Sequence, residues 1–404
     1  MRFTRARVSP ATIAQARSES VSIAAGYFWY YGGVGTFSPF AAIYYRHLGF
    51  EGIQLGLLTA MPAIGIALTG PIWGIFADSF GIHRQILRVV LLIAAVMSLT
   101  LSQITSFGPF LLVMALMALA LVPVPSLWDS YAVSAVERGG APYGVLRIFG
   151  SAGYTVFVTI MGRLLVGGVS NLIFFAYATS HVIACLVSFR LPPLGDRVSR
   201  RFWDGISLVL QKRSFLLVLF TAFLIAIGYS MLGMYLSVHV ASLGGSTSVA
   251  GIAYAISAMS ELPIIGFGSR ILRRLGARNV IMVSICMYTV RFALLGFSGS
   301  TIGVIAAQTL HGASFGMFLI ASVTLAYRLV GRENAATAQA MLAMMGVGLG
   351  NIVGSLLGGV MIDLTTTSIM YRCVMLLMIV TMGVFVIGSR LVGRDAFDPD
   401  YQSA

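Results

Sequence analysis

Charged residues are scarce in this chain of 404 residues. Only 10% of them are Asp, Glu, Lys or Arg, whereas 58% are hydrophobic and the mean hydropathy is +0.92. An ordinary soluble domain carries about 25% charged residues, so this composition leaves more apolar surface than one water-facing globule can bury. The scarcity of charge therefore excludes a typical soluble protein and indicates a membrane protein.

Cysteine is rare as well, because the chain has only Cys185, Cys286 and Cys373, each inside an apolar segment and without CxxC spacing. This pattern excludes a disulfide framework and a cysteine-based metal cluster. The sequence also lacks the nucleotide-binding loop GxxxxGK[ST], the HExxH motif, a haem motif and a recognisable catalytic triad. We therefore expect a protein that is not an enzyme and that uses no cofactor and no metal.

The net charge of +13 comes from basic residues that are scattered in short clusters between apolar runs. A nucleic-acid-binding protein would gather them into one patch or stripe, so we expect no nucleic-acid partner. Loops on the cytoplasmic side of a membrane have the observed arrangement, since they are enriched in Arg and Lys.

Twelve apolar runs are close to the length of about 20 residues that a membrane-spanning helix needs. They lie near 20–45, 52–77, 85–105, 108–135, 144–166, 171–189, 215–238, 248–269, 279–298, 300–327, 336–362 and 369–391. The first run has no obvious cleavage site, so we expect it to be retained as a helix. The predicted fold class is an all-α membrane protein with twelve transmembrane helices.

The positions of Arg and Lys predict the orientation. Of the 26 basic residues, 22 lie in alternate polar segments: the N-terminus, 84–88, 138–147, 190–213, 270–278, 328–332 and 390–394. The other set of loops holds only Arg46, Arg163 and Arg372. Both termini are therefore expected in the cytoplasm, in a multi-pass protein of the cell inner membrane.

The longest polar stretch, 190–214, is expected to be a cytoplasmic linker between a six-helix bundle at 20–189 and another at 215–391. Residues 1–19 and 392–404 would be cytoplasmic tails. An internal repeat supports this division, because Gly81 and Gly276 end similar glycine-containing segments 195 positions apart. Two related bundles around a central cavity are typical of secondary transporters. We expect a monomer.

The segment 74–84 reads Gly-Ile-Phe-Ala-Asp-Ser-Phe-Gly-Ile-His-Arg. It resembles the signature loop G-x-L-A-D-R-x-G-R-[KR] of the major facilitator superfamily, although positions 76, 79, 82 and 83 depart from it and Arg84 arrives one place late. Further segments resemble the branch that contains lactose permease, phenylpropionate permease and nucleoside:proton symporters: Pro39–Phe40, Pro125–Asp129, Tyr143–Tyr154 and Gln308–Gly316. The resemblance implies transport of a small molecule by alternating access. It also implies that Gly74, Asp78, Gly81 and Arg84 form a conformational gate, in which the acid stabilises the outward-facing state.

Three ionisable residues are expected near mid-membrane, where a charge is costly and usually faces a cavity or a partner. At about 1.5 Å per residue, Glu261 lies roughly 13 Å and Arg291 roughly 18 Å from the cytoplasmic boundary, and His311 lies at similar depth from the other side. Lactose permease is similar in having Glu, Arg and His on the matching helices for coupled proton transport. It also has a carboxylate one turn after its histidine, where this chain has Ser314.

Glu261 is thus the expected proton-coupling acid, because burial penalises a carboxylate while a nearby cation stabilises it. Arg291 and His311 would tune it. The alternative is that a fixed Glu261–Arg291 pair only holds two helices in register.

Candidate substrate-binding residues lie on several helices. Asp129 and Arg147, at comparable depth, allow a two-point contact between carboxylate and guanidinium; they would bind substrate or act as a cytoplasmic gate or brace. We interpret the aromatic residues as walls of the substrate cavity; the other interpretation is that they pack against lipid or lie at the membrane interface. The remaining candidates are Tyr27, Tyr30, Tyr31, Tyr229 and Gln308. The glycines 350, 354 and 358 are assigned to close helix packing.

Three classes of function stay open: a proton symporter for a sugar, nucleoside or aromatic acid, an exporter or uncoupled facilitator, and a sensor on the same fold. The segment Gly150–Tyr154 lacks the proline that drug:proton antiporters of the superfamily carry there. Uptake is therefore favoured, with protons, a small solute and the lipid bilayer as partners.

Overall fold

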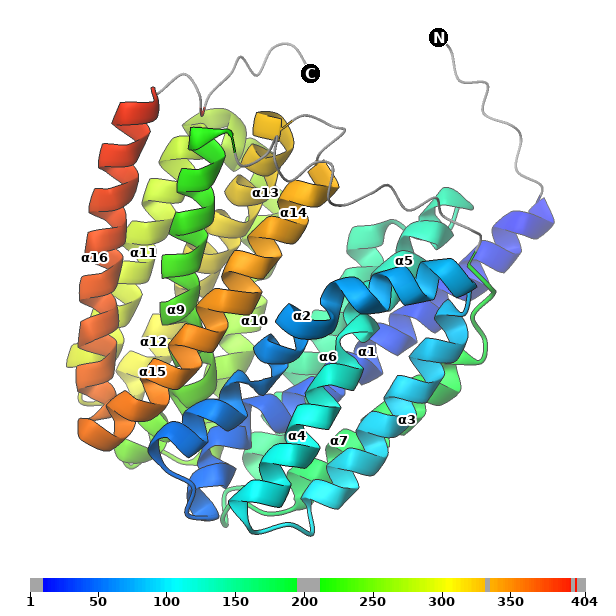
Figure 1. The fold of residues 1–404 in the computed structure, drawn as a ribbon, viewed down its shortest axis with the longest axis horizontal. Helices are drawn as coiled ribbons and strands as arrows, with labels where there is room; N and C mark the ends of the chain where they lie inside the picture. The colour runs from blue at the N-terminus through cyan, green and yellow to red at the C-terminus, as the bar shows by residue number, and fades with distance from the viewer. Residues whose placement is uncertain (1–9, 195–210, 331–334, 394–396, 398–404) are drawn as a thin grey trace. The chain divides into compact units, whose positions relative to one another are not determined.

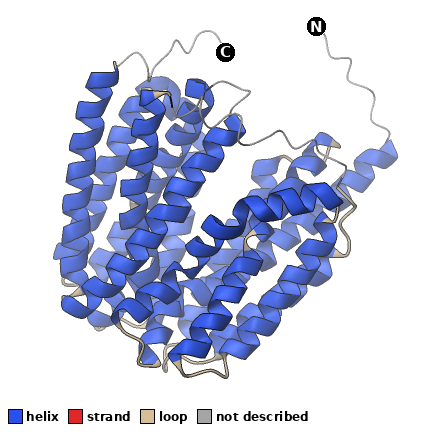
Figure 2. Ribbon diagram, viewed as in Figure 1, coloured by secondary structure: helices blue, strands red, loops and turns tan. Residues whose placement is uncertain are grey.

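The computed structural model describes residues 10–194, 211–330, 335–393 and 397. These residues form helices joined by short turns, and no strand occurs among them (Figure 2). The all-α fold expected from the sequence is therefore confirmed for the described residues.

The described residues of the first part of the chain form seven helices, which Figure 1 labels. They are α1 Pro10–His47, α2 Gly52–Phe80, α3 His83–Leu101, α4 Phe107–Leu121, α5 Pro123–Glu137, α6 Tyr143–Leu164 and α7 Leu172–Ser188. Val122, between α4 and α5, keeps helical dihedral angles, so the two helices together correspond to the expected run 108–135. Pro123 lacks the N–H that a continuous helix would use, which accounts for the break.

The second part forms helices that include two π-helical turns, η1 and η3. They are α9 Arg213–Ser242, α10 Thr247–Leu275, α11 Ala277–Phe297, α12 Thr301–Thr309, η1 Gly312–Gly316, α13 Met317–Val330, α14 Ala335–Ala343, η3 Met344–Gly350, α15 Asn351–Leu364 and α16 Thr367–Val392. The expected run 300–327 is thus α12, η1 and α13 in succession, and 336–362 is α14, η3 and α15.

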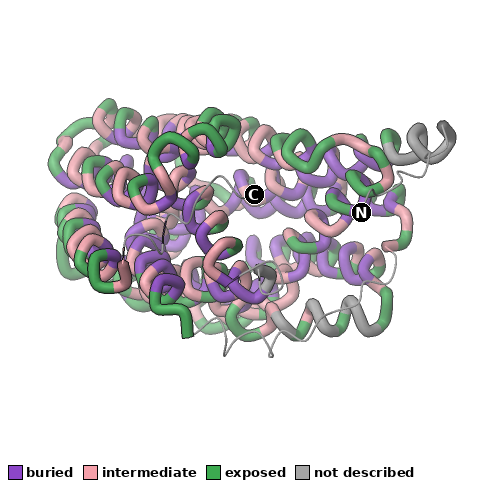
Figure 3. Tube along the Cα trace, turned by 90° about the horizontal axis from the view of Figure 1, so that it is seen from above, coloured by how far each residue is buried: buried purple, intermediate pink, exposed green. Residues whose placement is uncertain are grey.

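Ten helical segments of the described residues are long and apolar enough to cross a bilayer. The helix α7 is apolar too, but it has only 17 residues. A multi-pass membrane protein is therefore supported, while the number of twelve crossings stays a prediction. Individual helices carry exposed residues on one side and buried ones on the other, as Figure 3 shows.

The chain divides into two compact units. Unit 1 contains Met1–Phe37, Leu68–Val158 and Asn171–Ser199, and unit 2 contains Ser38–Ala67, Thr159–Ser170 and Arg200–Ala404. Two short segments of the first sequence half thus group with the second half. The linker expected at 190–214 falls largely on 195–210, outside the described residues, and the predicted bundle boundaries remain a prediction.

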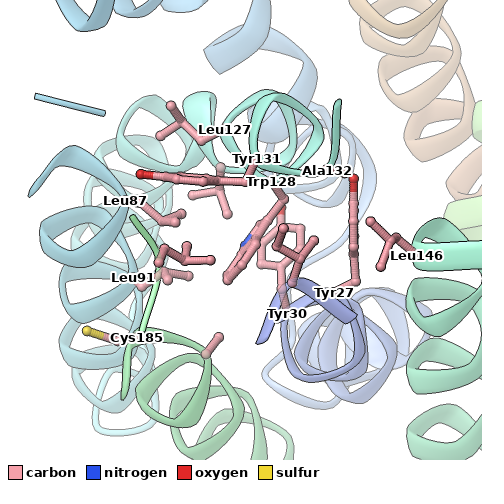
Figure 4. Packing of buried hydrophobic residues seen from close by; sticks show 14 of the residues in the cluster. Tyr27, Tyr30, Leu87, Leu91, Leu127, Trp128, Tyr131, Ala132, Leu146 and Cys185 are labelled. Atoms are coloured by element: carbon pink, nitrogen blue, oxygen red, sulfur yellow. The ribbon is translucent and has the colours of Figure 1, made fainter. Parts of the chain in front are cut away.

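The core of unit 1 is rich in aromatic residues (Figure 4). Tyr27, Trp128 and Tyr131 are fully buried and pack with leucines of α3 and α5. Gly26 of α1 faces the Trp128 ring so closely that a Cβ at this position would overlap the indole. Because lipid is as apolar as a protein core, such close contacts rather than hydrophobic burial hold membrane helices together.

In unit 2, the glycines of η3 and α15 allow α9 to approach. A Cβ at Gly350 would lie 2.5 Å from Cβ of Ala226, and one at Gly354 would overlap the backbone of Ile227. Gly358 faces the ring of Tyr235 in the same way. The packing role predicted for these glycines is confirmed.

Candidate functional site

The three mid-membrane residues of unit 2 meet in one polar cluster. Glu261 comes from α10, Arg291 from α11, and His311 from the turn between α12 and η1. The Glu261 Oε1 atom lies 2.5 Å from Nε2 of His311, and Nη1 of Arg291 lies 2.7 Å from Nδ1 of the same ring. His311 therefore stands between the acid and the guanidinium.

The direction of these hydrogen bonds follows from the chemistry of the donors. A guanidinium can only donate, so Nδ1 of His311 must accept from Arg291. The neutral imidazole then carries its proton on Nε2, which donates to the Glu261 carboxylate. The cluster is an ordered chain of donors that runs from Arg291 through His311 to Glu261.

Burial differs between the ends of this chain. Arg291 is 1% exposed, and the side chains of His311 and Glu261 are 7% and 23% exposed. Glu261 is thus the most exposed member of the cluster. The direct Glu261–Arg291 pair considered from the sequence is replaced, among the described residues, by a pair bridged through His311.

Gln308, suggested above as a substrate ligand, is fully buried beside this cluster. Its side-chain carbonyl oxygen accepts a hydrogen bond of 2.7 Å from Ser257 and another from Nη2 of Arg291. The sequence reasoning missed Ser257, although it lies four residues before Glu261 on one face of α10, a spacing that could have indicated it.

Aromatic rings cover one side of the cluster. The ring of Tyr229 on α9 stacks on Phe315 with centroids 4.9 Å apart, and Phe315 lies nearly parallel to His311 at 5.3 Å. Tyr229 is thus in contact with the cluster, and its role in substrate binding stays a prediction.

The turn that carries His311 is irregular. The π-helical turn η1 begins directly after His311, and Ser284 of α11 donates a 2.6 Å hydrogen bond to the Ser314 carbonyl within it. Such π turns occur frequently at functional sites. Nothing in the sequence pattern predicted this one.

A second polar cluster lies in unit 1. Asp129 on α5 accepts hydrogen bonds from the hydroxyl groups of Tyr27 and Tyr143, the latter at 3.0 Å. Arg147 on α6 instead places its guanidinium over the ring of Tyr31, 4.3 Å from the centroid. The two-point contact expected between Asp129 and Arg147 is thus replaced, in the described structure, by tyrosines from α1 and α6 and by a cation–π contact.

Tyr30 lies next to this cluster but is buried. Its ring packs edge-on against Tyr31 at 5.0 Å and against His181 of α7 at 5.6 Å. His181 is fully buried, stacks on Tyr177 at 3.9 Å, and was missed because it stands alone in an apolar helix.

The predicted gate residues lie at the end of α2 and the start of α3. Gly81 has a φ of 61°, a left-handed conformation that favours glycine and allows the sharp turn between the two helices. Arg84 donates a 3.3 Å hydrogen bond to the Leu191 carbonyl beyond the end of α7. Gly74 and Asp78 lie in α2, but the side chain of Asp78 is outside the described part of the structure.

Residues 20–373 match the model of the MFS_1 like family, and the chain therefore belongs to this branch of the major facilitator superfamily. The chain is 26% identical to an uncharacterised transporter, YwbF, of Bacillus subtilis over 88% of its length and 90% of the relative. It is 25% identical to the maltose permease of Geobacillus stearothermophilus, with 83% of this chain and 86% of that protein covered.

The fold is also that of solved transporters. The crystal structure of the nucleoside transporter NupG superposes with a TM-score of 0.82 at 20% identity and covers 92% of this chain and 98% of that one. A bacterial homologue of the lysosomal transporter Spinster, in an inward-facing and occupied conformation, gives 0.71 at 15% identity, with 95% and 98% covered. The protein is thus a transmembrane transporter and not an enzyme, and its substrate is a small molecule.

Proposed function

We propose that the protein takes up a small polar or aromatic solute by proton symport, with Glu261 as the residue that binds and releases the coupled proton. The observation that carries this proposal is the hydrogen-bonded chain of Arg291, His311 and Glu261 in unit 2. Glu261 is its only acid and its most exposed member.

The chain of donors explains how one acid can alternate between two protonation states. With the N–H of His311 against it, the carboxylate of Glu261 keeps its negative charge, because a charge-assisted hydrogen bond offsets the cost of burial. When His311 moves away, the bare carboxylate becomes costly in an apolar environment, and binding a proton removes that cost. A conformational change that separates Glu261 from His311 would therefore cause Glu261 to bind the coupled proton.

His311 itself is unsuited to carry the proton. Its Nδ1 atom already accepts from Arg291, so a second ring proton would point an N–H at a guanidinium N–H and bring two cations together. The proton is therefore assigned to Glu261, and His311 is assigned the role of a neutral donor.

The topology belongs to the same proposal. Twelve crossings with both termini in the cytoplasm, in the inner membrane, agree with the excess of Arg and Lys in alternate segments. A monomer satisfies the mechanism, since each polar cluster is built from one chain.

The solute is proposed from the relatives and from unit 1. Relatives are named as permeases for maltose, nucleosides, xanthosine and, as a probable transporter, 3-phenylpropionic acid. The cluster of Asp129, Arg147 and tyrosines offers hydrogen-bond acceptors, a cation and ring faces, which suit a hydroxylated or aromatic ring. A thermal-shift screen with maltose, xanthosine and 3-phenylpropionate would identify the class, because a ligand stabilises the state that binds it.

The test of coupling uses the ligand found in that screen. Glu261→Gln keeps the shape and hydrogen bonding of the side chain but removes its titrating proton. In proteoliposomes, accumulation driven by a proton gradient should disappear, while exchange of substrate across the membrane persists. The matched control is Glu51→Gln, which changes an exposed carboxylate before α2 and should leave both activities unchanged.

Accumulation against a gradient by Glu261→Gln would place the proton site elsewhere, with Asp129 the next residue to test. Wild-type protein that equilibrates substrate but never accumulates it would favour an uncoupled facilitator. Substrate extrusion driven by inward proton flow would favour an exporter.

A further inference from the structure

Two residues that hold Arg291 in place have no role in the transport scheme so far. The Oε1 atom of Gln308 accepts from Nη2 of Arg291 and from the hydroxyl of Ser257 at 2.7 Å. Nη2 of Arg291 also lies 3.4 Å from the Ser257 oxygen. The three side chains come from α10, α11 and α12 and are 9%, 1% and 0% exposed for Ser257, Arg291 and Gln308.

The planarity of the guanidinium turns this anchoring into a constraint on its other edge. Because the five N–H groups of Arg form a rigid fork, fixing Nη2 on Gln308 also fixes the direction of Nη1. Nη1 then points at Nδ1 of His311, 2.7 Å away. Ser257 and Gln308 thus fix one end of the guanidinium, and the other end is thereby held against Nδ1 of His311.

We propose that Ser257 and Gln308 are positioning residues that hold His311 in the neutral tautomer with its proton on Nε2, and so supply the N–H that Glu261 requires. The inference rests on the proposed function in that it takes Glu261 as the proton site. It goes beyond it by naming residues that control the proton affinity of this site without touching Glu261 themselves.

The surroundings leave Glu261 as the group that binds the proton. The other titratable side chains around Arg291 are Tyr229 on α9, Tyr288 on α11 and Tyr371 on α16. Phenols ionise near pH 10 in water, so these side chains stay neutral in the working range. A change at Gln308 or Ser257 is therefore transmitted to Glu261 through Arg291 and His311.

The Gln308 carbonyl is the anchor of Arg291, and its loss has a defined consequence. Without the Gln308 carbonyl, Arg291 is free to leave Nδ1, and the proton of His311 can occupy either ring nitrogen. Glu261 then loses its N–H donor for part of the time. Since this hydrogen bond stabilises only the charged form of Glu261, we expect its loss to tighten proton binding by Glu261 by about ten-fold.

The experiment needs no transported ligand. The chain contains only five histidines and five glutamates, so protein labelled with 15N-His and carboxyl-13C-Glu gives few signals, in lipid nanodiscs. His311→Gln and Glu261→Gln assign the two residues by loss of a signal. Wild-type protein should show His311 with a bare Nδ1 and a protonated Nε2.

Gln308→Leu removes the anchor, Ser257→Ala weakens it, and Gln308→Glu preserves it. Gln308→Leu and Ser257→Ala should both shift His311 towards a mixture of tautomers and tighten proton binding by Glu261, measured from its carboxyl 13C signal, with the smaller effect in Ser257→Ala. Gln308→Glu keeps an acceptor oxygen for Arg291 and should retain the wild-type His311 spectrum. Ser257→Ala removes a single hydroxyl and serves as the test if Gln308→Leu does not fold.

An unchanged His311 spectrum in Gln308→Leu and Ser257→Ala would overturn the positioning role. A changed His311 spectrum with unchanged proton binding by Glu261 would overturn control of the proton site. Failure of the proposed function is seen separately, as gradient-driven accumulation by Glu261→Gln, and leaves the spectroscopic result intact.

Discussion

Thr59 on α2 and Tyr235 on α9 share a hydrogen bond of 3.1 Å, although 176 positions separate them in the sequence. The Tyr235 hydroxyl donates to the Ser355 carbonyl at 2.8 Å, so its oxygen is available to accept from Thr59. A Cβ on nearby Gly359 would lie 2.8 Å from the Cα atom of Gly56. Unit 2 therefore contains a tight junction between the start of α2 and the second sequence half.

Substitution of Gly359 by a larger residue should open this junction. In Gly359→Leu the new Cβ meets the backbone of Gly52 and Gly56, which cannot rotate away as a side chain would. A cysteine introduced at Thr59, in a background without Cys185, Cys286 and Cys373, should then react several-fold faster with a polar maleimide. Gly383→Leu is the matched control, because a Cβ there meets no atom within 4 Å. Equal labelling rates in the two variants would contradict the junction.

The hydrogen bond itself makes a smaller contribution. Thr59→Val keeps the shape of the side chain and removes its hydroxyl, which should favour separation by about 1 kcal/mol, or roughly five-fold. Labelling of a cysteine introduced at Ser355 reports this change. A rate equal to that of the parent would show that the bond does not stabilise the junction.

Asp129→Asn tests the polar cluster of unit 1. The Tyr27 and Tyr143 hydroxyls both donate to Oδ1 of Asp129, and the amide keeps an oxygen there but removes the negative charge, so both hydrogen bonds should weaken. We expect substrate affinity to fall by about ten-fold, which corresponds to about 1.4 kcal/mol, while proton coupling persists. Isothermal titration with the ligand from the screen measures the affinity, and an unchanged value would assign Asp129 to a structural role.

Asp78→Asn tests the gate. Because the gate biases the equilibrium between conformations and not the substrate cavity, transport should slow while ligand affinity stays within a few-fold of the wild type. Complete loss of binding would show that the residue acts on the binding site instead.

Cysteine labelling in sealed cells tests the orientation. Cysteines introduced at Ser199 and Ala404 should react only with reagents that enter the cytoplasm, and one at Ser246, before α10, should react from outside. Labelling of the Ser199 variant by an impermeant reagent would reverse the proposed topology.

Much of the fold was predictable because helical geometry is regular. Apolar length gave the helical segments, and a rise of about 1.5 Å per residue placed Glu261, Arg291 and His311 at one level, where the structure brings them together. The family followed from short motifs, and the match over residues 20–373 confirms it.

The order of contacts within each cluster was not predictable. His311 lies between Glu261 and Arg291 directly before a π turn, and such a turn leaves no periodic signal in the sequence. The contact considered between Asp129 and Arg147 stays a prediction, and the hydrogen bond that Asp129 accepts from Tyr27, 102 positions away, was not foreseen. Depth along a helix can be counted from sequence, but the direction of a side chain depends on partners that the chain brings in from elsewhere.

The π turn at Gly312–Gly316 holds one residue more than an α-helix would use over the same length. If the π turn shifted to another position along the helix, the residues between its old and new positions would rotate by about 100°, the angle between successive residues. His311 stands at the edge of this turn, so such a rotation would carry its N–H away from Glu261 while α12 and α13 remain helical. Access to the carboxylate can then be controlled by torsion within one helix, without displacement of a whole bundle.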